Sequence, residues 1–324
     1  MEVIQVQLNK DESIAFCCDI HMDSQTPSSR IDDIQVTVID KIKDIREKCV
    51  ERNVKHLFFE GDIFNRVACP HSCVNLIGEE FLKFKDCGIE LYSILGNHDI
   101  VRNSLEAIEK SPIQTLFSFG VLKHINLNTR VVINKKVMVT PVDYTEYPPK
   151  ASSDAKFNIL LAHMFYDASD LIADERHNLS KKDITKLKYD MVVLGHDHEE
   201  YSDVIQDDCV IIRSGSVLRG TSHNYNFTRE PKFVVIRDID NPKDSIEKVV
   251  IKHKPYKDIA SEYVINKKQL SSITGLKDVL SNLAEKLAES SENDGDRIFE
   301  IIKSDPKLPT DCRALLLKYI AEST

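Results

Sequence analysis

The chain has 324 residues, of which 42% are hydrophobic and 29% charged, a composition typical of a soluble globular protein long enough to bury a large core. Its 52 acidic and 43 basic residues give a formal net charge of -9, which argues against a protein that holds nucleic acid through a broad basic surface of its own. The apolar runs are strand-sized and the start lacks the pattern of a signal peptide, so we expect a cytoplasmic protein with no membrane segment.

The eight cysteines are scattered through a chain too large to need disulfide bonds for its stability, and we expect reduced thiols. Only Cys69 and Cys73 form a cluster with a possible ligand, His71, between them. Because no second cysteine pair of suitable spacing completes a zinc site, we interpret this segment as a loop with two ordinary thiols.

The first third of the chain predicts strands that alternate with helices. Two strands at residues 3–8 and 13–18 are joined by turn-forming residues, and a helix follows at residues 31–52. A strand at residues 56–60, a helix at 73–87 and a strand at 91–95 complete the pattern of a mostly parallel sheet covered by helices. Along one face of the first helix, apolar residues recur at steps of three and four: Ile31, Ile34, Val38, Ile42, Ile45 and Cys49.

Residues after about 121 favour a second sheet packed on the first, because short runs rich in Val and Ile follow one another. These runs lie at residues 131–133, 137–140, 158–162, 191–194, 210–213, 233–236 and 249–252. After about residue 254 the composition changes, and helices are expected at residues 271–289, 297–303 and 310–321. We therefore predict a main domain at residues 1–253 and a small helical C-terminal region at residues 254–324.

Polar side chains follow five of the predicted strands at the point where each strand ends. They are Asp19 and His21, then Asp62, then Asn97 and His98, then His163, and finally His196 and His198. The carboxyl ends of the strands in such a sheet meet at one edge, where ligands bind. Any one of these motifs occurs by chance or as a turn, but all of them in order predict one shared site.

The residue types at this edge indicate a site for two metal ions. Imidazole nitrogens, carboxylates and an amide oxygen, without a thiolate, suit manganese, iron or zinc. Such a set is too large for one ion, but it suits two ions that share the carboxylate of Asp62. Two ions about 3.5–4 Å apart lower the pKa of a water between them and hold a phosphate oxygen, so the pattern predicts phosphoester hydrolysis.

These motifs are similar to those of calcineurin-like metallophosphoesterases: Asp19 with His21, Gly61 with Asp62, Gly96 to Asp99, His163, and Gly195 to His198. The resemblance implies an α/β fold, a two-sheet sandwich flanked by helices in four layers (αββα), with residues 1–253 as the catalytic domain. It also implies two divalent metal ions, of which manganese is the one we favour. One ion would be held by Asp19, His21, Asp62 and His198, and the other by Asp62, Asn97, His163 and His196.

A narrower resemblance is to the SbcD-type nucleases of DNA repair and recombination, especially short phage-encoded ones. The segment from Gly61 to Arg66 and the turn at Gly215 and Ser216 carry this resemblance. It implies an exonuclease or endonuclease that acts on DNA, an SbcC-like ABC-type ATPase as partner, and a homodimer. The region after about residue 271 is then a candidate docking element for the ATPase, or alternatively its leucines pack on the chain's own second sheet.

In the expected mechanism, a hydroxide that bridges the two ions attacks phosphorus. His98 is left free by the ligand set and is the candidate proton donor to the leaving oxygen, while Asp99 either orients His98 or caps a turn. Arg30 and Arg66 are weaker candidates for contacts with phosphate, and each is otherwise a surface or packing arginine.

Two other functions are consistent with the sequence. The same chemistry on a small phosphoester, a nucleotide or a cyclic nucleotide is favoured by the acidic net charge and opposed by the SbcD-like segments. A scaffold that has lost catalysis and only binds a partner would show gaps in the ligand set, whereas every ligand position is filled in this chain.

Overall fold

The computed structural model describes residues 2–101, 105–167, 178–201 and 203–271, together with Ile302, Lys303, Arg313 and Leu317. The helices predicted for the C-terminal region fall largely outside these residues. The chain divides into two compact units. The first contains Met1–Thr26, Asp33–Arg219 and Thr228–Lys254, and the second contains Pro27–Asp32, Gly220–Phe227 and Pro255–Thr324.

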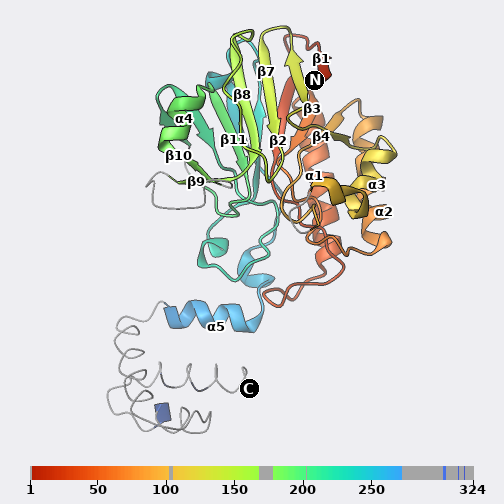
Figure 1. The fold of residues 1–324 in the computed structure, drawn as a ribbon. Helices are drawn as coiled ribbons and strands as arrows, with labels where there is room; N and C mark the ends of the chain where they lie inside the picture. The colour runs from red at the N-terminus through yellow and green to blue at the C-terminus, as the bar shows by residue number, and fades with distance from the viewer. Residues whose placement is uncertain are drawn as a thin grey trace. The chain divides into compact units, whose positions relative to one another are not determined.

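The first unit contains two large sheets, which Figure 1 shows face to face. One sheet has six strands in the order β15-β14-β2-β3-β4-β5. Their bounds are Ser13–Cys17 for β2, Val54–Phe59 for β3, Glu90–Ser93 for β4, Lys123–His124 for β5, Lys232–Ile236 for β14 and Ile246–Val250 for β15. Strands β2 to β5 run parallel, and β14 lies antiparallel between β2 and β15. The sequence placed β14 and β15 in the other sheet, which was wrong because pairing between strands distant in the chain has no local signal.

The other sheet has seven strands in the order β1-β6-β7-β8-β11-β13-β12. Their bounds are Glu2–Val6 for β1, Thr129–Ile133 for β6, Val137–Val142 for β7, Phe157–His163 for β8, Met191–Gly195 for β11, Val204–Gln206 for β12 and Cys209–Ile212 for β13. Strands β7, β8, β11 and β13 run parallel. Because β1 pairs with β6, the turn after β1 carries the chain from one sheet to the other. Two further short strands, β9 (Phe165–Asp167) and β10 (Asn178–Ser180), pair with each other.

Helices cover the outer face of each sheet, which makes four layers (Figure 1). The six-stranded sheet is covered by α1 (Ile34–Glu51), α2 (His71–Asp86) and α3 (Pro112–Ser118). The seven-stranded sheet is covered by α4 (Lys181–Leu187). Short 3₁₀ helices lie at Leu105–Lys110, Asn224–Phe227, Pro242–Ser245 and Tyr256–Asp258. The predicted two-sheet sandwich flanked by helices is confirmed.

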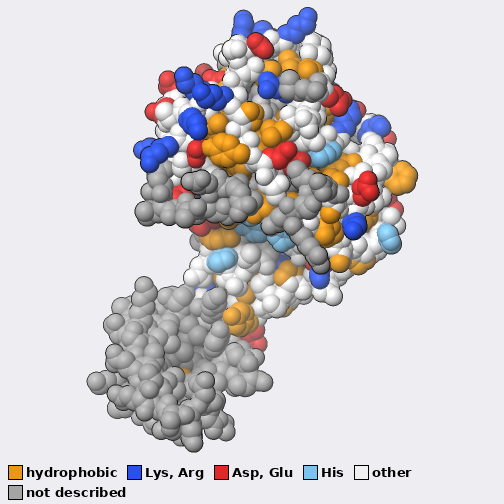
Figure 2. Space-filling model, viewed as in Figure 1, with side chains coloured by type: hydrophobic (Ala, Val, Ile, Leu, Met, Phe, Trp, Pro, Cys, Tyr) orange, Lys and Arg blue, Asp and Glu red, His pale blue; other side chains and the backbone are white. Residues whose placement is uncertain are grey.

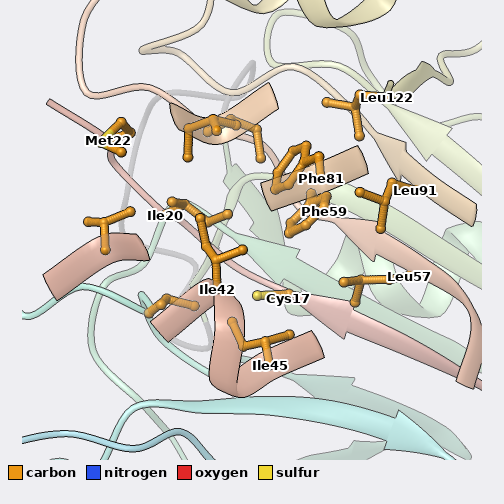
Figure 3. Packing of buried hydrophobic residues seen from close by; sticks show 14 of the residues in the cluster. Cys17, Ile20, Met22, Ile42, Ile45, Leu57, Phe59, Phe81, Leu91 and Leu122 are labelled. Carbon is orange, nitrogen blue, oxygen red and sulfur yellow. The ribbon is translucent and has the colours of Figure 1, made fainter. Parts of the chain in front are cut away.

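The central strands are apolar on both faces because each face meets a different layer. In β2, Cys17 faces the helices (Figure 3), while Phe16 packs in the cluster between the sheets. In β8, Leu161 packs between the sheets and Leu160 packs towards α4. Burial of one such side chain stabilises the fold by about 1.5–3 kcal/mol. The ends of these strands are therefore held in place, which fixes the position at which each following loop begins.

Helix α1 begins at Ile34 rather than at the predicted Ile31. Asp33 is the N-cap, and its side chain accepts hydrogen bonds from the backbone N–H groups of Gln35 and Val36. Ile31, which the sequence placed in the buried stripe, is 69% exposed, whereas Ile34 and the later members of the stripe are buried.

The described part of the second unit contains a small apolar cluster. Tyr256, Ile259, Ala260 and Val264 are buried in it, and it includes the start of α5 (Glu262–Ser271). Among the described residues of the whole chain, no helix is both long and apolar enough to cross a membrane.

Candidate metal centre

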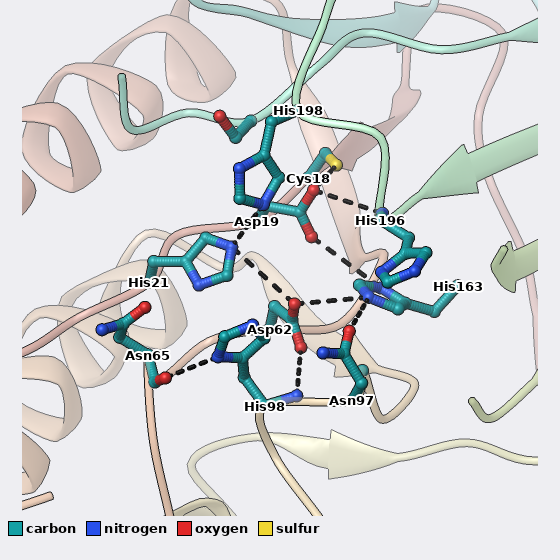
Figure 4. Close-up of polar contacts among 12 residues, drawn as sticks. Cys18, Asp19, His21, Asp62, Asn65, Asn97, His98, His163, His196 and His198 are labelled. Carbon is teal, nitrogen blue, oxygen red and sulfur yellow. Dashed lines mark hydrogen bonds and ion pairs between the residues drawn. The ribbon is translucent and has the colours of Figure 1, made fainter. Parts of the chain in front are cut away.

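Five strands of the first unit deliver the predicted side chains to one edge of the sandwich. The loops after β2, β3 and β4 carry Asp19 and His21, Asp62, and Asn97 and His98. Strand β8 ends at His163, and β11 is followed by His196 and His198. Figure 4 shows these side chains pointing towards one another. The structure therefore brings together residues that are up to 179 positions apart in the sequence, from 19 to 198.

Four of these residues have a backbone conformation that L-amino acids rarely adopt. The φ angle is 43° at Asp19, 50° at His21, 52° at Asp62 and 85° at His196. Such conformations cost about 1–3 kcal/mol each and persist where the surrounding structure enforces them, often at functional sites. At these four residues the strained backbone directs the side chain into the cluster, which is the arrangement expected where side-chain direction is needed for function.

Asp62 lies at the centre of the cluster. Its Oδ2 is 3.3 Å from Nε2 of His163 and 3.7 Å from Nε2 of His21. Its Oδ1 accepts a hydrogen bond of 2.9 Å from the backbone N–H of His98. The carboxylate thus faces both halves of the cluster, which is the position that a bridging ligand needs.

The other ligand candidates form a group on each side of Asp62. Asp19, His21 and His198 offer ligand atoms within 4.8 Å of one another, and so do Asp62, His163 and His196. On the first side, the Nε2 atoms of His21 and His198 are 2.9 Å apart. On the second side, Oδ1 of Asn97 is 3.1 Å from Nε2 of His163. A third such group consists of His21, Asp62 and His98, so His98 lies within the same cluster of possible ligands.

Backbone groups orient these ligands. Nδ1 of His163 donates a hydrogen bond of 2.7 Å to the carbonyl of Glu60, which leaves Nε2 for a metal ion. Oδ2 of Asp19 accepts hydrogen bonds from Sγ of Cys18 at 2.7 Å and from the backbone N–H of His196 at 3.2 Å. A Cβ atom at Gly96 would overlap the carboxylate of Asp62 and lie 2.6 Å from its backbone nitrogen, so the loop requires glycine there.

Burial and neighbouring charges shift the pKa values of the residues in the cluster. Burial raises the pKa of Asp19 and lowers the pKa of His21 and His196 to about 3. Burial also opposes the charges of His163 and Asp62, but their mutual attraction overrides it. It raises the pKa of His163 to about 10 and lowers the pKa of Asp62.

The residues present fit divalent metal ions. Within the described ranges, Oδ1 of Asp19 and Oδ2 of Asp62 are buried and accept no hydrogen bond, although imidazole nitrogens lie 3.8 Å and 3.3 Å away. Buried carboxylate oxygens in this state are costly unless a cation meets them. Nitrogen and oxygen donors without a thiolate suit manganese, iron or zinc.

His98 lies beside the cluster in a position suited to proton transfer. Its Nδ1 is 2.5 Å from the backbone carbonyl of Asn65, and because a carbonyl only accepts, Nδ1 carries the hydrogen. The other ring nitrogen faces Asp62 (Figure 4). The ring lies 4.9 Å from that of His21, centroid to centroid, in an edge-on arrangement.

The expected hydrogen bond from His98 to Asp99 is not formed, because both partners have other contacts. Nδ1 of His98 donates to Asn65, and the Asp99 carboxylate accepts backbone N–H groups of Asp62 at 2.7 Å, Gly96 at 3.1 Å and Phe64 at 3.4 Å. Burial and the neighbouring Asp62 raise the pKa of Asp99 to about 8. Asp99 therefore ties the loops after β3 and β4 together, as in the alternative that assigned it to a turn.

The two candidate arginines are paired with carboxylates. Arg30, in the second unit, has a buried side chain and forms two hydrogen bonds with Asp32 at 2.9 Å and 2.6 Å. Arg66, in the first unit, is 43% exposed and donates from Nε and Nη2 to Asp23 at 2.8–3.1 Å.

Three residues beside the cluster were not singled out by the sequence. The ring of Phe165 lies 4.1 Å from that of His196 and is 38% exposed. Glu60 is buried, and burial together with the charge of Asp19 raises its pKa to about 8. Asp23 is 2% exposed and accepts hydrogen bonds from the loop after β3. Each of the three lies two positions from a predicted ligand: Glu60 from Asp62, Asp23 from His21 and Phe165 from His163. This proximity is a signal that could have found them.

The two-sheet αββα sandwich, with carboxylates, imidazoles and an amide gathered at its strand ends, defines the class of metal-dependent phosphoester hydrolases. The model of the calcineurin-like phosphoesterase family matches residues 13–200, which hold every candidate ligand, and the chain belongs to this family. The family uses divalent metal ions. No curated protein sequence matches the chain.

Solved structures with a similar fold share little sequence with this chain. A dimetal phosphatase from Danio rerio has a TM-score of 0.50 at 9% identity, and the match covers 75% of this chain and 100% of that one. For the protein TT1561 of Thermus thermophilus the TM-score is 0.47 at 7% identity, with 74% and 99% covered. For a Staphylococcus aureus protein described as a candidate 5'-nucleotidase it is 0.44 at 14% identity, with 75% and 55% covered. The likeness to the Danio rerio protein concerns the fold alone.

Proposed function

We propose that the protein is a metal-dependent phosphodiesterase that cleaves DNA. The observation that supports hydrolysis most directly is the position of His98. One of its ring nitrogens is held by the carbonyl of Asn65, and the other faces Asp62 within the cluster. Hydrolysis of an unactivated phosphodiester is accelerated by a proton donor for the leaving oxygen in addition to metal ions, and His98 fits that role.

The ligands would be divided between two ions that share Asp62. Asp19, His21, Asp62 and His198 would hold one ion, and Asp62, Asn97, His163 and His196 the other. When bound, such ions lower the pKa of a water and offset the negative charge of the phosphate. The carbonyl of Glu60 keeps Nε2 of His163 directed into the site, and His98 supplies a proton to the departing alkoxide.

DNA as the substrate is supported by the SbcD-like segments. The turn at Gly215 and Ser216 packs against the loop that carries His198, since the backbone N–H of Ser216 donates to the carbonyl of His198 at 3.3 Å. A Cβ atom at Gly215 would lie 2.8 Å from the backbone nitrogen of Glu200. The turn thus supports a ligand loop, which gives this part of the resemblance a structural role.

A small phosphoester is the second candidate substrate, and the acidic net charge of -9 favours it. On the face shown in Figure 2, acidic and basic side chains of the described residues are interspersed. DNA would then have to be held mainly by the metal ions or by a partner.

The test is a comparison of substrates with one matched pair of variants. The full chain with Mn²⁺ is expected to degrade linear DNA and to leave phosphomonoesters and cyclic nucleotides intact. His98→Ala is expected to lower the rate by about 10²–10⁴-fold. His253→Ala is the control, because its Nδ1 also contacts a backbone carbonyl, that of Ile251 at 2.8 Å, and we expect no change. Turnover of small esters alone would exclude DNA as the substrate, and full activity of His98→Ala would remove its role.

The same resemblance supports an SbcC-like ABC-type ATPase as partner and a homodimer of the phosphoesterase. Sedimentation of the purified protein tests the homodimer, and a monomer at every concentration would exclude it. Co-purification with an ATPase of this type from the same genome tests the partnership. Failure of the two proteins to associate with or without DNA would count against it.

A further inference from the structure

Asp23 lies two positions after His21 and is 2% exposed, yet none of the roles described so far uses it. Its Oδ2 accepts a hydrogen bond of 2.7 Å from Nδ2 of Asn65. The guanidinium of Arg66 donates hydrogen bonds to both carboxylate oxygens. Its Nε lies 3.1 Å from Oδ1 and 2.9 Å from Oδ2, and its Nη2 lies 2.8 Å from Oδ1. Oδ1 also accepts the backbone N–H of Ser24 at 2.7 Å. A buried carboxylate thus organises two successive residues of the loop after β3.

The two segments that Asp23 joins already lie side by side through their backbones. The N–H of His21 donates to the carbonyl of Asp62 at 3.0 Å, and the N–H of Met22 donates to that of Ile63 at 2.9 Å. The N–H of Asn65 returns a hydrogen bond of 2.9 Å to the carbonyl of Met22. Asp23 follows directly on this ladder and adds side-chain bonds where the backbone bonds end. Its bonds hold the side chains of Asn65 and Arg66, the two residues joined by the peptide group that contains the Asn65 carbonyl.

That peptide group holds His98. The carbonyl of Asn65 accepts the Nδ1 hydrogen of His98 at 2.5 Å, and this bond selects the tautomer and the ring angle. A donor that is displaced or rotated transfers its proton less well, because proton transfer depends on a heavy-atom distance near 3 Å. The contacts run without a break from the Asp23 carboxylate through Asn65 to the imidazole.

We propose that Asp23 is a positioning residue for His98, with Arg66 as the clamp that holds Asp23 in place. This inference rests on the proposed role of His98 as proton donor. It gives Arg66 a structural role instead of the contact with substrate phosphate that the sequence suggested as one alternative. It also predicts that the two residues act on the departure of the leaving group rather than on substrate binding.

Two diesters that differ only in the leaving group provide the kinetic test. In a thymidine dinucleotide the leaving group is a sugar alkoxide that needs a proton. In the p-nitrophenyl ester of the same nucleotide it is a stabilised phenolate that needs none. For Asp23→Ala with Mn²⁺ we expect kcat to fall about 10–100-fold on the dinucleotide and less than about 3-fold on the p-nitrophenyl ester. The loss on the dinucleotide is smaller than the about 10²–10⁴-fold of full acid catalysis, because His98 is displaced but still present. Asp23→Asn keeps one acceptor oxygen for Asn65 and should recover part of the loss.

A double-mutant cycle separates this role from a general effect on the fold. In a protein that already carries His98→Ala, the additional Asp23→Ala change should lower the dinucleotide rate less than about 2-fold, because the residue through which it acts is gone. Arg66→Ala should resemble Asp23→Ala with a smaller loss and an unchanged KM. Arg52→Ala is the matched control, since Arg52 forms a comparable ion pair with Glu247 at 2.8 Å, and it should have no effect.

A measurement without turnover completes the test. In the metal-free protein with isotope-labelled histidine, the Nδ1–H signal of His98, assigned by its loss in His98→Gln, should disappear or broaden in Asp23→Ala and persist in Arg52→Ala. The inference is overturned if this signal is unchanged, if both esters are slowed equally, or if the losses from Asp23→Ala and His98→Ala multiply. If the wild-type protein cleaves neither diester, the proposed function fails while the spectroscopic arm still decides the position of His98.

Discussion

Asp99 offers a sharp test of how the candidate metal centre is held together. Its carboxylate is 0% exposed and accepts the backbone N–H groups of Asp62 at 2.7 Å, Gly96 at 3.1 Å and Phe64 at 3.4 Å. Asp99→Ala would leave these donors buried without an acceptor. One buried donor without a partner costs about 1–3 kcal/mol, and the two shorter bonds carry most of the effect. We therefore expect the free energy of unfolding to fall by about 2–6 kcal/mol.

Asp99→Asn should behave differently, because its amide oxygen can replace Oδ2 and keep the two shorter bonds. Only the 3.4 Å contact with Phe64 would be lost, so we expect a decrease of about 1 kcal/mol. Urea unfolding of both variants in a chelator, followed by circular dichroism, measures the two values. Equal losses for Asn and Ala, or no loss for Ala, would refute the assignment of Asp99 to these backbone donors.

Three further predictions concern other parts of the first unit. Gly96→Ala should abolish stabilisation by Mn²⁺ in thermal melts, because its Cβ would displace the Asp62 carboxylate. Gly78→Ala is the control and should leave the stabilisation intact, because its Cβ meets only Leu116 at 3.5 Å. Stabilisation of Gly96→Ala by Mn²⁺ would contradict the geometry of the site. Mn²⁺ at a concentration of 100 Kd should stabilise the wild type by about 2.7 kcal/mol. Asp62→Asn should reduce this stabilisation and His98→Ala should keep it. If His98→Ala lost the stabilisation and Asp62→Asn kept it, His98 would be the metal ligand and Asp62 would not. Burial lowers the pKa of His56 to about 4, so the unfolded chain binds the extra proton first and stability is lost as the pH falls from about 6.5 towards 4. Urea titrations at pH 7 and pH 5 measure the free energy of unfolding, which should decrease less between the two pH values in His56→Gln than in the wild type. Equal decreases would count against the lowered pKa of His56.

The convergence of the ligand candidates was predictable because each follows an apolar run, and parallel strands bring their carboxyl ends to one edge. The partners of the strands were not, since β14 pairs with β2 across more than 200 residues and no local feature marks that choice. The role of Asp99 was ambiguous for a similar reason. Its neighbour His98 suggested an imidazole partner, but the carboxylate accepts backbone N–H groups of Asp62 and Gly96, which lie in two loops that only the folded chain brings close. Asp23 lies two positions after His21, but the sequence does not show which side chains of the loop after β3 this carboxylate contacts in the folded chain.

The pairing of the strands also affects when the site can form during synthesis. Strand β2, which ends just before Asp19, is flanked on one side by β3 and on the other by β14 at Lys232–Ile236. Strand β1 similarly cannot pair until β6 at Thr129–Ile133 has been synthesised. Until residue 236 has left the ribosome, β14 cannot pair with β2, and one edge of β2 is exposed. Asp19 and His21, which follow β2, are then not held in place by the complete sheet. Such long-range pairing slows folding, so the metal centre should mature after translation of most of the first unit and not strand by strand.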